Sequence, residues 1–135
     1  SKKTKRRARK YFMTVDTNLE AVVEKCVEQH GDHCWFYAPL TAAYNHIFLQ
    51  SEGLHGVRIH SIELWNMEGE LVAGEIGYAC GAAFTSLSGF SDRSEPGAGT
   101  CQLETLGVLL EQAGFDFWDL GKLLLGMPFS FIFFC

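Results

Sequence analysis

The stretch HSIELWNMEGELVAGEIGY, residues 60–78, decides the fold. Polar and apolar residues alternate on both sides of a turn at residues 66–69, and a period of two is typical of antiparallel strands. Ile62 and Leu64 therefore share one face of the first strand. A further run, residues 83–90, continues the alternation. The pattern predicts a three-stranded antiparallel meander.

Two helical patterns precede this meander. Apolar residues recur at helical spacing over residues 17–30 and again over residues 39–52. We expect Thr17 and Glu20 to form the capping box that starts the first helix. Gly53 is the expected stop of the second. The two segments therefore predict a pair of helices that precede the meander in the chain.

A third helix and a last strand follow the meander. Residues 100–113 predict a helix with leucines on its inner face, and Gly114 releases the chain into the strand FDFWDLG, residues 115–121. A first strand, YFMTV, opens the domain at residues 11–15. The predicted order of elements is β-α-α-β-β-β-α-β, which is an α/β fold.

The basic residues gather at the start of the chain. Residues 1–10 hold seven of the 11 Lys and Arg, among them Lys5, Arg6, Arg7 and Arg9. The remainder carries four basic and 16 acidic side chains, a net charge of −12. A basic arm on an acidic body suggests a polyanion partner that binds through the arm, and a plain solvated chain end is the alternative. We expect the phosphates of any RNA partner to contact this arm.

Cysteine and histidine spacing predicts no metal site. The five cysteines include no C-x-x-C pair, and the five histidines include no H-E-x-x-H motif. We therefore expect no metal, and reduced thiols in a cytoplasmic protein. The chain start shows no apolar signal-peptide core. Residues 122–135 form an atypical apolar segment, interrupted by Gly126 and Pro128, that is too short to cross a bilayer.

Four segments, HSIELW, GELVAGEIGYACGAAF, SGFS and FDFWDLG, together resemble the leucyl/phenylalanyl-tRNA-protein transferase family. The resemblance covers about residues 5–121. It implies an acetyltransferase-like (GNAT) transferase domain at residues 11–121, with helices packed on a mixed, largely antiparallel sheet. Members of that family move leucine, phenylalanine or methionine from aminoacyl-tRNA to the α-amine of proteins that begin with Lys or Arg. This transfer marks the acceptor for degradation in the N-degron pathway and needs no cofactor beyond the charged tRNA.

The same resemblance implies which residues bind substrate. Aromatic residues along these strands line the family's pocket for the aminoacyl-adenosine end of tRNA, and Trp65, Phe84 and Phe90 stand at matching positions. Stacking on such a ring is worth roughly 1–3 kcal/mol per base. Core packing between sheet and helix is the alternative. We expect Glu63 to be an orienting or solvent-facing carboxylate and Glu75 to be a surface charge.

The chain departs from the family pattern at polar positions. Where the family reads F-x-G-E-S-M-F-S, this sequence reads FTSLSGFS, with Leu87 at the acidic position and Ser88 retained for substrate binding. Gly121 stands where the family has a glutamine. Asp119 is thus the catalytic carboxylate that the resemblance carries over. We expect it to hold the incoming α-amine or its departing proton.

Two other functions stay open. The stretch RSEPGAGT lies between a strand and a helix, as does the pyrophosphate loop of acyl-CoA-dependent N-acyltransferases. Backbone N–H groups there predict an anion site for a phosphate of tRNA or of acyl-CoA, at Gly97, Ala98, Gly99 and Thr100. A plain β-to-α connection is the alternative. The third hypothesis is a catalytically inactive module that binds protein N-termini or RNA without turnover.

Overall fold

The backbone is built on one six-stranded sheet with strand order β1-β2-β3-β4-β5-β6. The computed structural model describes residues 10–33, 38–50, 52–120 and 131–133. All neighbouring strands are antiparallel except β4 and β5, which are parallel. The strands are β1 (Tyr11–Val15), β2 (Val57–Asn66), β3 (Leu71–Cys80), β4 (Ala83–Ser91), β5 (Phe117–Asp119) and β6 (Phe131–Phe133). The predicted meander is therefore confirmed as β2, β3 and β4.

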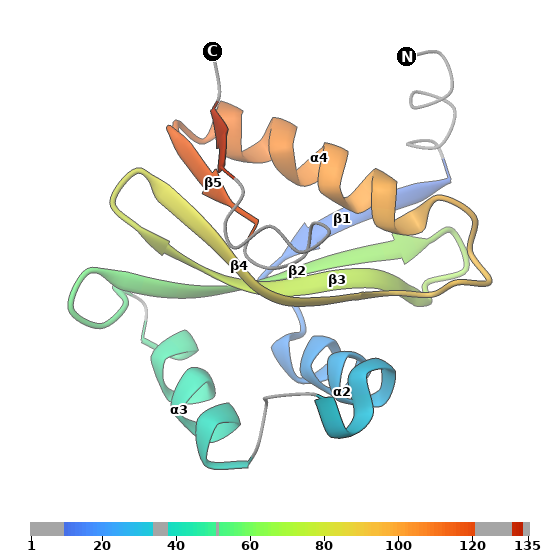
Figure 1. Ribbon diagram of the computed structural model, residues 1–135, viewed down its shortest axis with the longest axis horizontal. Coiled ribbons are helices and arrows are strands. Elements are labelled where there is room, and N and C mark those ends of the chain that lie inside the picture. The colour runs from blue at the N-terminus through green and yellow to red at the C-terminus, as the bar shows by residue number, and fades with distance from the viewer. Residues whose placement is uncertain (1–9, 34–37, 51, 121–130, 134–135) are drawn as a thin grey trace.

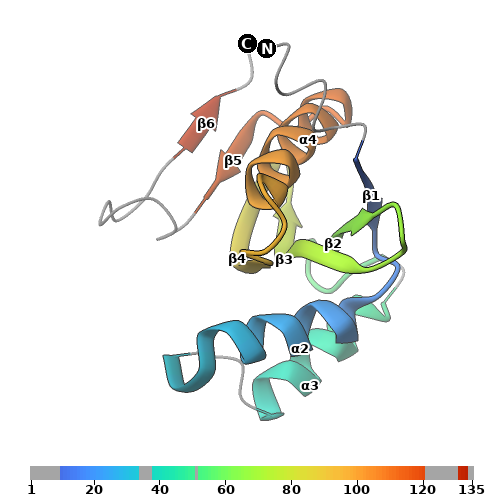
Figure 2. The same ribbon diagram turned by 90° about the vertical axis from the view of Figure 1, so that its right-hand side faces the viewer.

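Helices cover both faces of this sheet (Figures 1 and 2). Helices α2 (Leu19–His30) and α3 (Ala38–Phe48) lie on one face, and a short 3₁₀ turn, η1 (Gly31–His33), follows α2. Helix α4 (Ala98–Gln112) lies on the other face. Among the described residues, no helix is long and apolar enough to cross a membrane.

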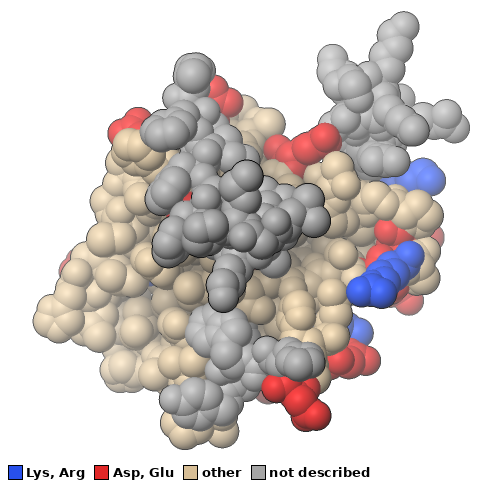
Figure 3. Space-filling model, in the orientation of Figure 1, with Lys and Arg blue, Asp and Glu red and all other residues tan. Residues whose placement is uncertain are grey.

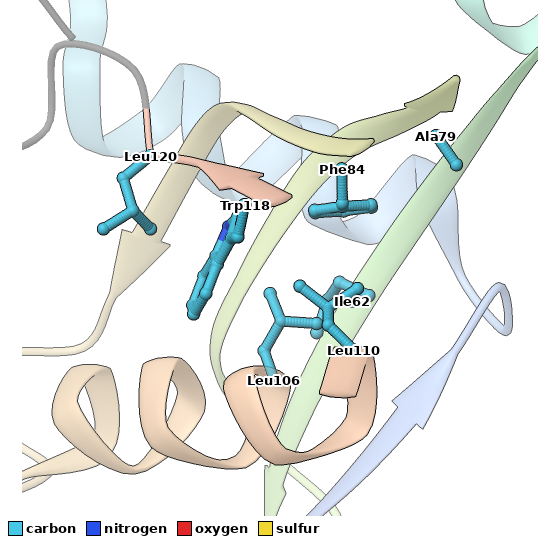
Figure 4. Close-up of a cluster of buried hydrophobic side chains, with 7 residues drawn as sticks. All are labelled: Ile62, Ala79, Phe84, Leu106, Leu110, Trp118 and Leu120. Carbon is cyan, nitrogen blue, oxygen red and sulfur yellow. The ribbon is translucent and has the colours of Figure 1, made fainter. Parts of the chain in front are cut away.

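Separate apolar clusters fill the two interfaces. Under α4, the side chains of Phe84, Leu106 and Trp118 pack together with four other buried residues (Figure 4). Under α2, Val22 and Cys26 pack on Ile76 with no exposed surface. Because each strand of the meander is covered on both sides, β2 is buried at almost every position from Ile59 to Asn66. Simple alternation of buried and exposed residues therefore does not hold in β2.

A β-bulge at Leu87 exchanges the two faces of β4. Gly77 pairs with Ser86, but the next pair is Ile76 with Ser88, so Leu87 has no partner across the ladder. Before the bulge, side chains at even positions face α4. After it they face α2, because an extra residue shifts the pleat by one.

Strands β4 and β5 pair over a short distance only. The parallel register joins Ala83–Thr85 to Phe117–Asp119, and β4 continues to Ser91 beyond that point. On its other side β5 pairs with β6. The predicted apolar C-terminal segment thus contributes one short strand at Phe131–Phe133, and the rest of residues 122–135 lies outside the described residues.

Two local predictions were wrong. Asn18, not Thr17, caps α2, since its side chain accepts a hydrogen bond from the Ala21 N–H at 3.0 Å. Thr17 donates instead to Glu63. Helix α3 ends at Phe48, and Gly53 lies in the following turn with φ of 75°.

Candidate functional site

A cavity opens where β4 runs on without β5. Its volume is about 230 Å³. Three layers contribute to its lining: Gln29 and His30 from α2; Glu75, Gly89, Phe90 and Ser91 from the sheet; and Gly99, Gln102 and Leu103 from α4 with Leu120, the residue after β5. The cavity therefore lies at the gap between the parallel strands and reaches both faces of the sheet.

Glu75 is the carboxylate of this cavity. Its side chain faces α4, because its cross-strand partners Ile62 and Gly89 share that face. Only 1% of the residue is exposed. One carboxylate oxygen accepts a 2.6 Å hydrogen bond from the Ser86 hydroxyl, and the other accepts a 2.8 Å bond from the Gln102 amide. The sequence-based expectation that Glu75 is a surface charge was therefore wrong.

The hydrogen bonds around Glu75 run in one direction. The Trp118 indole N–H donates to the Ser86 oxygen at 2.9 Å, and the Ser86 hydroxyl donates to Glu75. In this series of hydrogen bonds, each donor thus points toward the Glu75 carboxylate. Burial raises the pKa of Glu75 above its ordinary value of 4.5, and the bonds from Ser86 and Gln102 oppose that rise. The carboxylate has neutral donors around it and no cation among them.

Side chains from α2 hold the open edge of β4. The Gly89 carbonyl bonds to His30 Nε2 at 2.7 Å, and the Ser91 N–H donates to the Gln29 side-chain oxygen at 3.0 Å. Because the carbonyl can only accept, His30 Nε2 carries the proton. These two bonds satisfy backbone groups that β5 leaves without a strand partner.

The predicted aromatic substrate residues do not form one wall. Phe84 lies in the cluster under α4, and Phe90 lies in the cluster under α2. The bulge at Leu87 separates them, since both have even numbers and would otherwise share a face. Only Phe90 lines the cavity. Ser88 is buried and pairs with Ile76 on the α2 face.

Trp65 and Glu63 lie together on the α2 side of β2, away from the cavity. The Trp65 indole donates to the Thr14 hydroxyl at 2.8 Å. Glu63 has no exposed surface and accepts hydrogen bonds from Thr14, Thr17 and Ser61 and from the Asn18 backbone N–H. The carboxylate is therefore not solvent-facing, and it ties β1 and the start of α2 to the sheet.

The glycine-rich loop forms the start of α4 as expected. Gly97 is the N-cap with φ of 79°, and the Ala98 N–H donates to the Glu95 carbonyl at 3.2 Å. Ala98 is buried, and Gly99 reaches the cavity. The first turn carries no acidic side chain. Of the predicted anion-binding residues, Gly99 is thus the one that borders the cavity, with Thr100 next to it in the helix.

Asp119 ends β5 beside the gap. It is half-buried and pairs in register with Thr85. Because Trp118 and Leu120 both pack under α4, alternation turns Asp119 toward the opposite face. The predicted contacts of Lys5, Arg6, Arg7 and Arg9 lie outside the described residues.

Sequence reasoning missed the polar group formed by Glu75, Ser86, Gln102 and Trp118. A signal existed for Gln102, which stands four residues before Leu106 on the same helical stripe. The predicted stripe placed Leu103 inward instead, and Leu103 is 36% exposed. No local pattern marks the bulge at Leu87 that brings Gly89 opposite Glu75. Among the described residues, no group of three His, Cys, Asp or Glu side chains is placed to hold a metal ion.

Comparison with a solved structure shows the fold. The chain is similar to an acetyltransferase of the GNAT family from Staphylococcus aureus MU50, with a TM-score of 0.57 and 12% sequence identity. The match covers 82% of this chain and 72% of that one. The GNAT-like fold predicted from the sequence is therefore confirmed.

Comparison of sequences shows the family. The chain is 32% identical over 111 residues to a leucyl/phenylalanyl-tRNA–protein transferase of Alkalilimnicola ehrlichii and 33% identical over 115 residues to that of Paramagnetospirillum magneticum. These matches cover 81% and 84% of this chain but 40% and 51% of the relatives, so the chain spans about half their length. A sequence model of the family described as leucyl/phenylalanyl-tRNA protein transferase matches residues 1–123. The chain therefore belongs to the leucyl/phenylalanyl-tRNA protein transferase family.

Proposed function

We propose that this chain is the catalytic part of an aminoacyltransferase that moves a hydrophobic amino acid from charged tRNA to the α-amine of a protein. The observation that carries the proposal is the 230 Å³ cavity at the gap between β4 and β5, in a chain of this family. Phe90, Leu103 and Leu120 supply an apolar lining that suits leucine, phenylalanine or methionine. Tagging of basic N-termini for degradation in the cytoplasm is the biological role that goes with this reaction.

The chemistry asks little of the protein beyond positioning. A neutral amine attacks the ester carbonyl, and holding both reactants close supplies about 7–11 kcal/mol of barrier reduction. A proton acceptor adds about 10²- to 10⁴-fold. We propose that Asp119, at the end of β5, holds the α-amine of the acceptor protein. The glycine-rich start of α4 is the proposed site for a phosphate near the 3′ end of the tRNA, because helix N-termini favour anions.

Acyl-CoA is the second candidate donor. The likeness to a GNAT acetyltransferase and the approach of Gly99 to the cavity favour it. An extended acyl-CoA arm that paired with the edge of β4 would have to displace His30 and Gln29 from Gly89 and Ser91. Those bonds favour the aminoacyl donor.

A labelled transfer assay tests the proposal. The protein is incubated with radiolabelled leucyl-, phenylalanyl- or methionyl-tRNA, or with acetyl-CoA, and peptides that begin with Arg, Lys or Ala. We expect label in peptides only from charged tRNA, and more in those that begin with Arg or Lys. Transfer from acetyl-CoA alone would replace the proposal by the acyl-CoA function. Binding of charged tRNA with no transfer would leave a binding module.

A further inference from the structure

Glu75 stands in a cavity that is otherwise built for an uncharged ligand. The remaining side chains of the lining include the apolar Phe90, Leu103 and Leu120. The Gln102 amide donates its hydrogen bond to the Glu75 carboxylate. Among the described lining residues, His30 is the one other titratable group, and its Nε2 is bonded to the Gly89 carbonyl. A carboxylate here costs free energy that a purely structural apolar residue would not.

The two hydrogen bonds to the Glu75 carboxylate leave part of its acceptor capacity unused. Each carboxylate oxygen accepts one hydrogen bond from the protein, and an ionised carboxylate has about four acceptor sites. Both donors are neutral. On the strand side, Ile62 from β2 and Gly89 from β4 flank it, and neither carries charge. Gly89 keeps the position opposite Glu75 free of a side chain, since a Cβ there would lie 3.3 Å from the Glu75 Cβ.

We propose that Glu75 recognises the α-amine of the donor amino acid, and so makes this cavity select an aminoacyl group over a plain acyl group. The inference rests on the proposed function, since it places the donor in this cavity. An ammonium group forms a charge-assisted hydrogen bond with a carboxylate and neutralises it in an environment of low dielectric. The apolar side chain of the same amino acid then contacts Phe90, Leu103 and Leu120.

The burial of Glu75 favours tight binding of an amine in this cavity. Without a ligand, burial raises the pKa of Glu75, because no cation stabilises the ionised form. A bound ammonium would lower that pKa again. An acyl group without an amine offers no such compensation, so the cavity would disfavour it.

A pair of matched ligands tests this inference. One is 3′-(phenylalanylamino)-3′-deoxyadenosine, a stable amide analogue of the aminoacyl-adenosine end, and the other is its N-acetyl derivative, which lacks the charge. We expect the parent protein to bind the free-amine compound at least about tenfold more tightly by calorimetry, the factor for one hydrogen bond to a charged group. In Glu75→Gln the two affinities should agree within about threefold. Glu63→Gln, a buried carboxylate on the other face of the sheet, should keep the preference.

A spectroscopic readout needs no variant. The carboxyl ¹³C signal of Glu75 should titrate at lower pH when the free-amine compound is bound and should not change with the N-acetyl compound. Equal affinity of the parent for both ligands, or a preference that survives in Glu75→Gln, would overturn the inference. Transfer from charged tRNA with equal ligand affinities leaves the proposed function standing and removes this role of Glu75. A preference for the free-amine compound without transfer from charged tRNA would overturn the proposed function but not the role of Glu75. If neither ligand binds and no transfer occurs, both proposals are overturned.

Discussion

Glu75 should make the stability of the fold depend on pH. Its pKa is raised above 4.5 in the folded protein, so the folded state holds more protons than the unfolded state between 4.5 and the raised value. The free energy of unfolding should therefore fall as pH rises through that window. In Glu75→Gln, urea unfolding at about pH 5 and about pH 8 should show a smaller fall than in the parent. An equal fall in both proteins would mean that Glu75 keeps its ordinary pKa.

Asp119 should affect transfer rather than folding. Asp119→Asn keeps the shape of the side chain and removes its charge, so we expect a loss of about 10²-fold or more in kcat/KM for the peptide acceptor, with little change in thermal unfolding. Asp116→Asn, an exposed aspartate three residues earlier, is the matched control. Equal transfer rates in Asp119→Asn and the parent would assign Asp119 to structure.

Helix α2 depends on a cap that the sequence pattern assigned to the wrong residue. Asn18→Ala removes the acceptor of the Ala21 N–H and should lower the free energy of unfolding by about 1 kcal/mol. Asn18→Asp keeps an acceptor and should stay close to the parent in the same urea titration. Equal losses in the two variants would contradict the capping role of Asn18.

Strands and helices with a clear hydrophobic period were predictable from the sequence. The face of the sheet on which particular side chains lie was not. Residues 60–78 gave the β2-β3 hairpin, because the alternation and the turn residues agree. The faces of Phe84 and Phe90 depend on the bulge at Leu87, which follows from pairing with β3 and leaves no trace in local sequence. Glu75 reads as a surface residue because a charged side chain is seldom buried without a partner. Its burial becomes tolerable only when Ser86 and Gln102, distant in sequence, reach it.

At the scale of the whole molecule, we expect tRNA to bind through the basic residues 1–10, because the rest of the chain has a net negative charge. Lys and Arg are few on the face shown in Figure 3 and stand among Asp and Glu. Replacing Lys5, Arg6, Arg7 and Arg9 by glutamine should weaken tRNA binding and flatten its salt dependence. With the seven basic residues of residues 1–10 present, we expect a log-log slope of about −5. Unchanged filter-binding affinity in the glutamine variant would contradict this role of the arm.

The bulge at Leu87 also limits how this protein can diverge. A substitution in β4 alters one side chain, but loss of one residue beside Leu87 would turn every later side chain to the opposite face. Phe90 would leave the α2 cluster, and Gly89 would no longer lie over Glu75. Natural selection should therefore act more strongly on the length of β4 than on its composition. An insertion or deletion there would be inherited only together with a second one that restores the register.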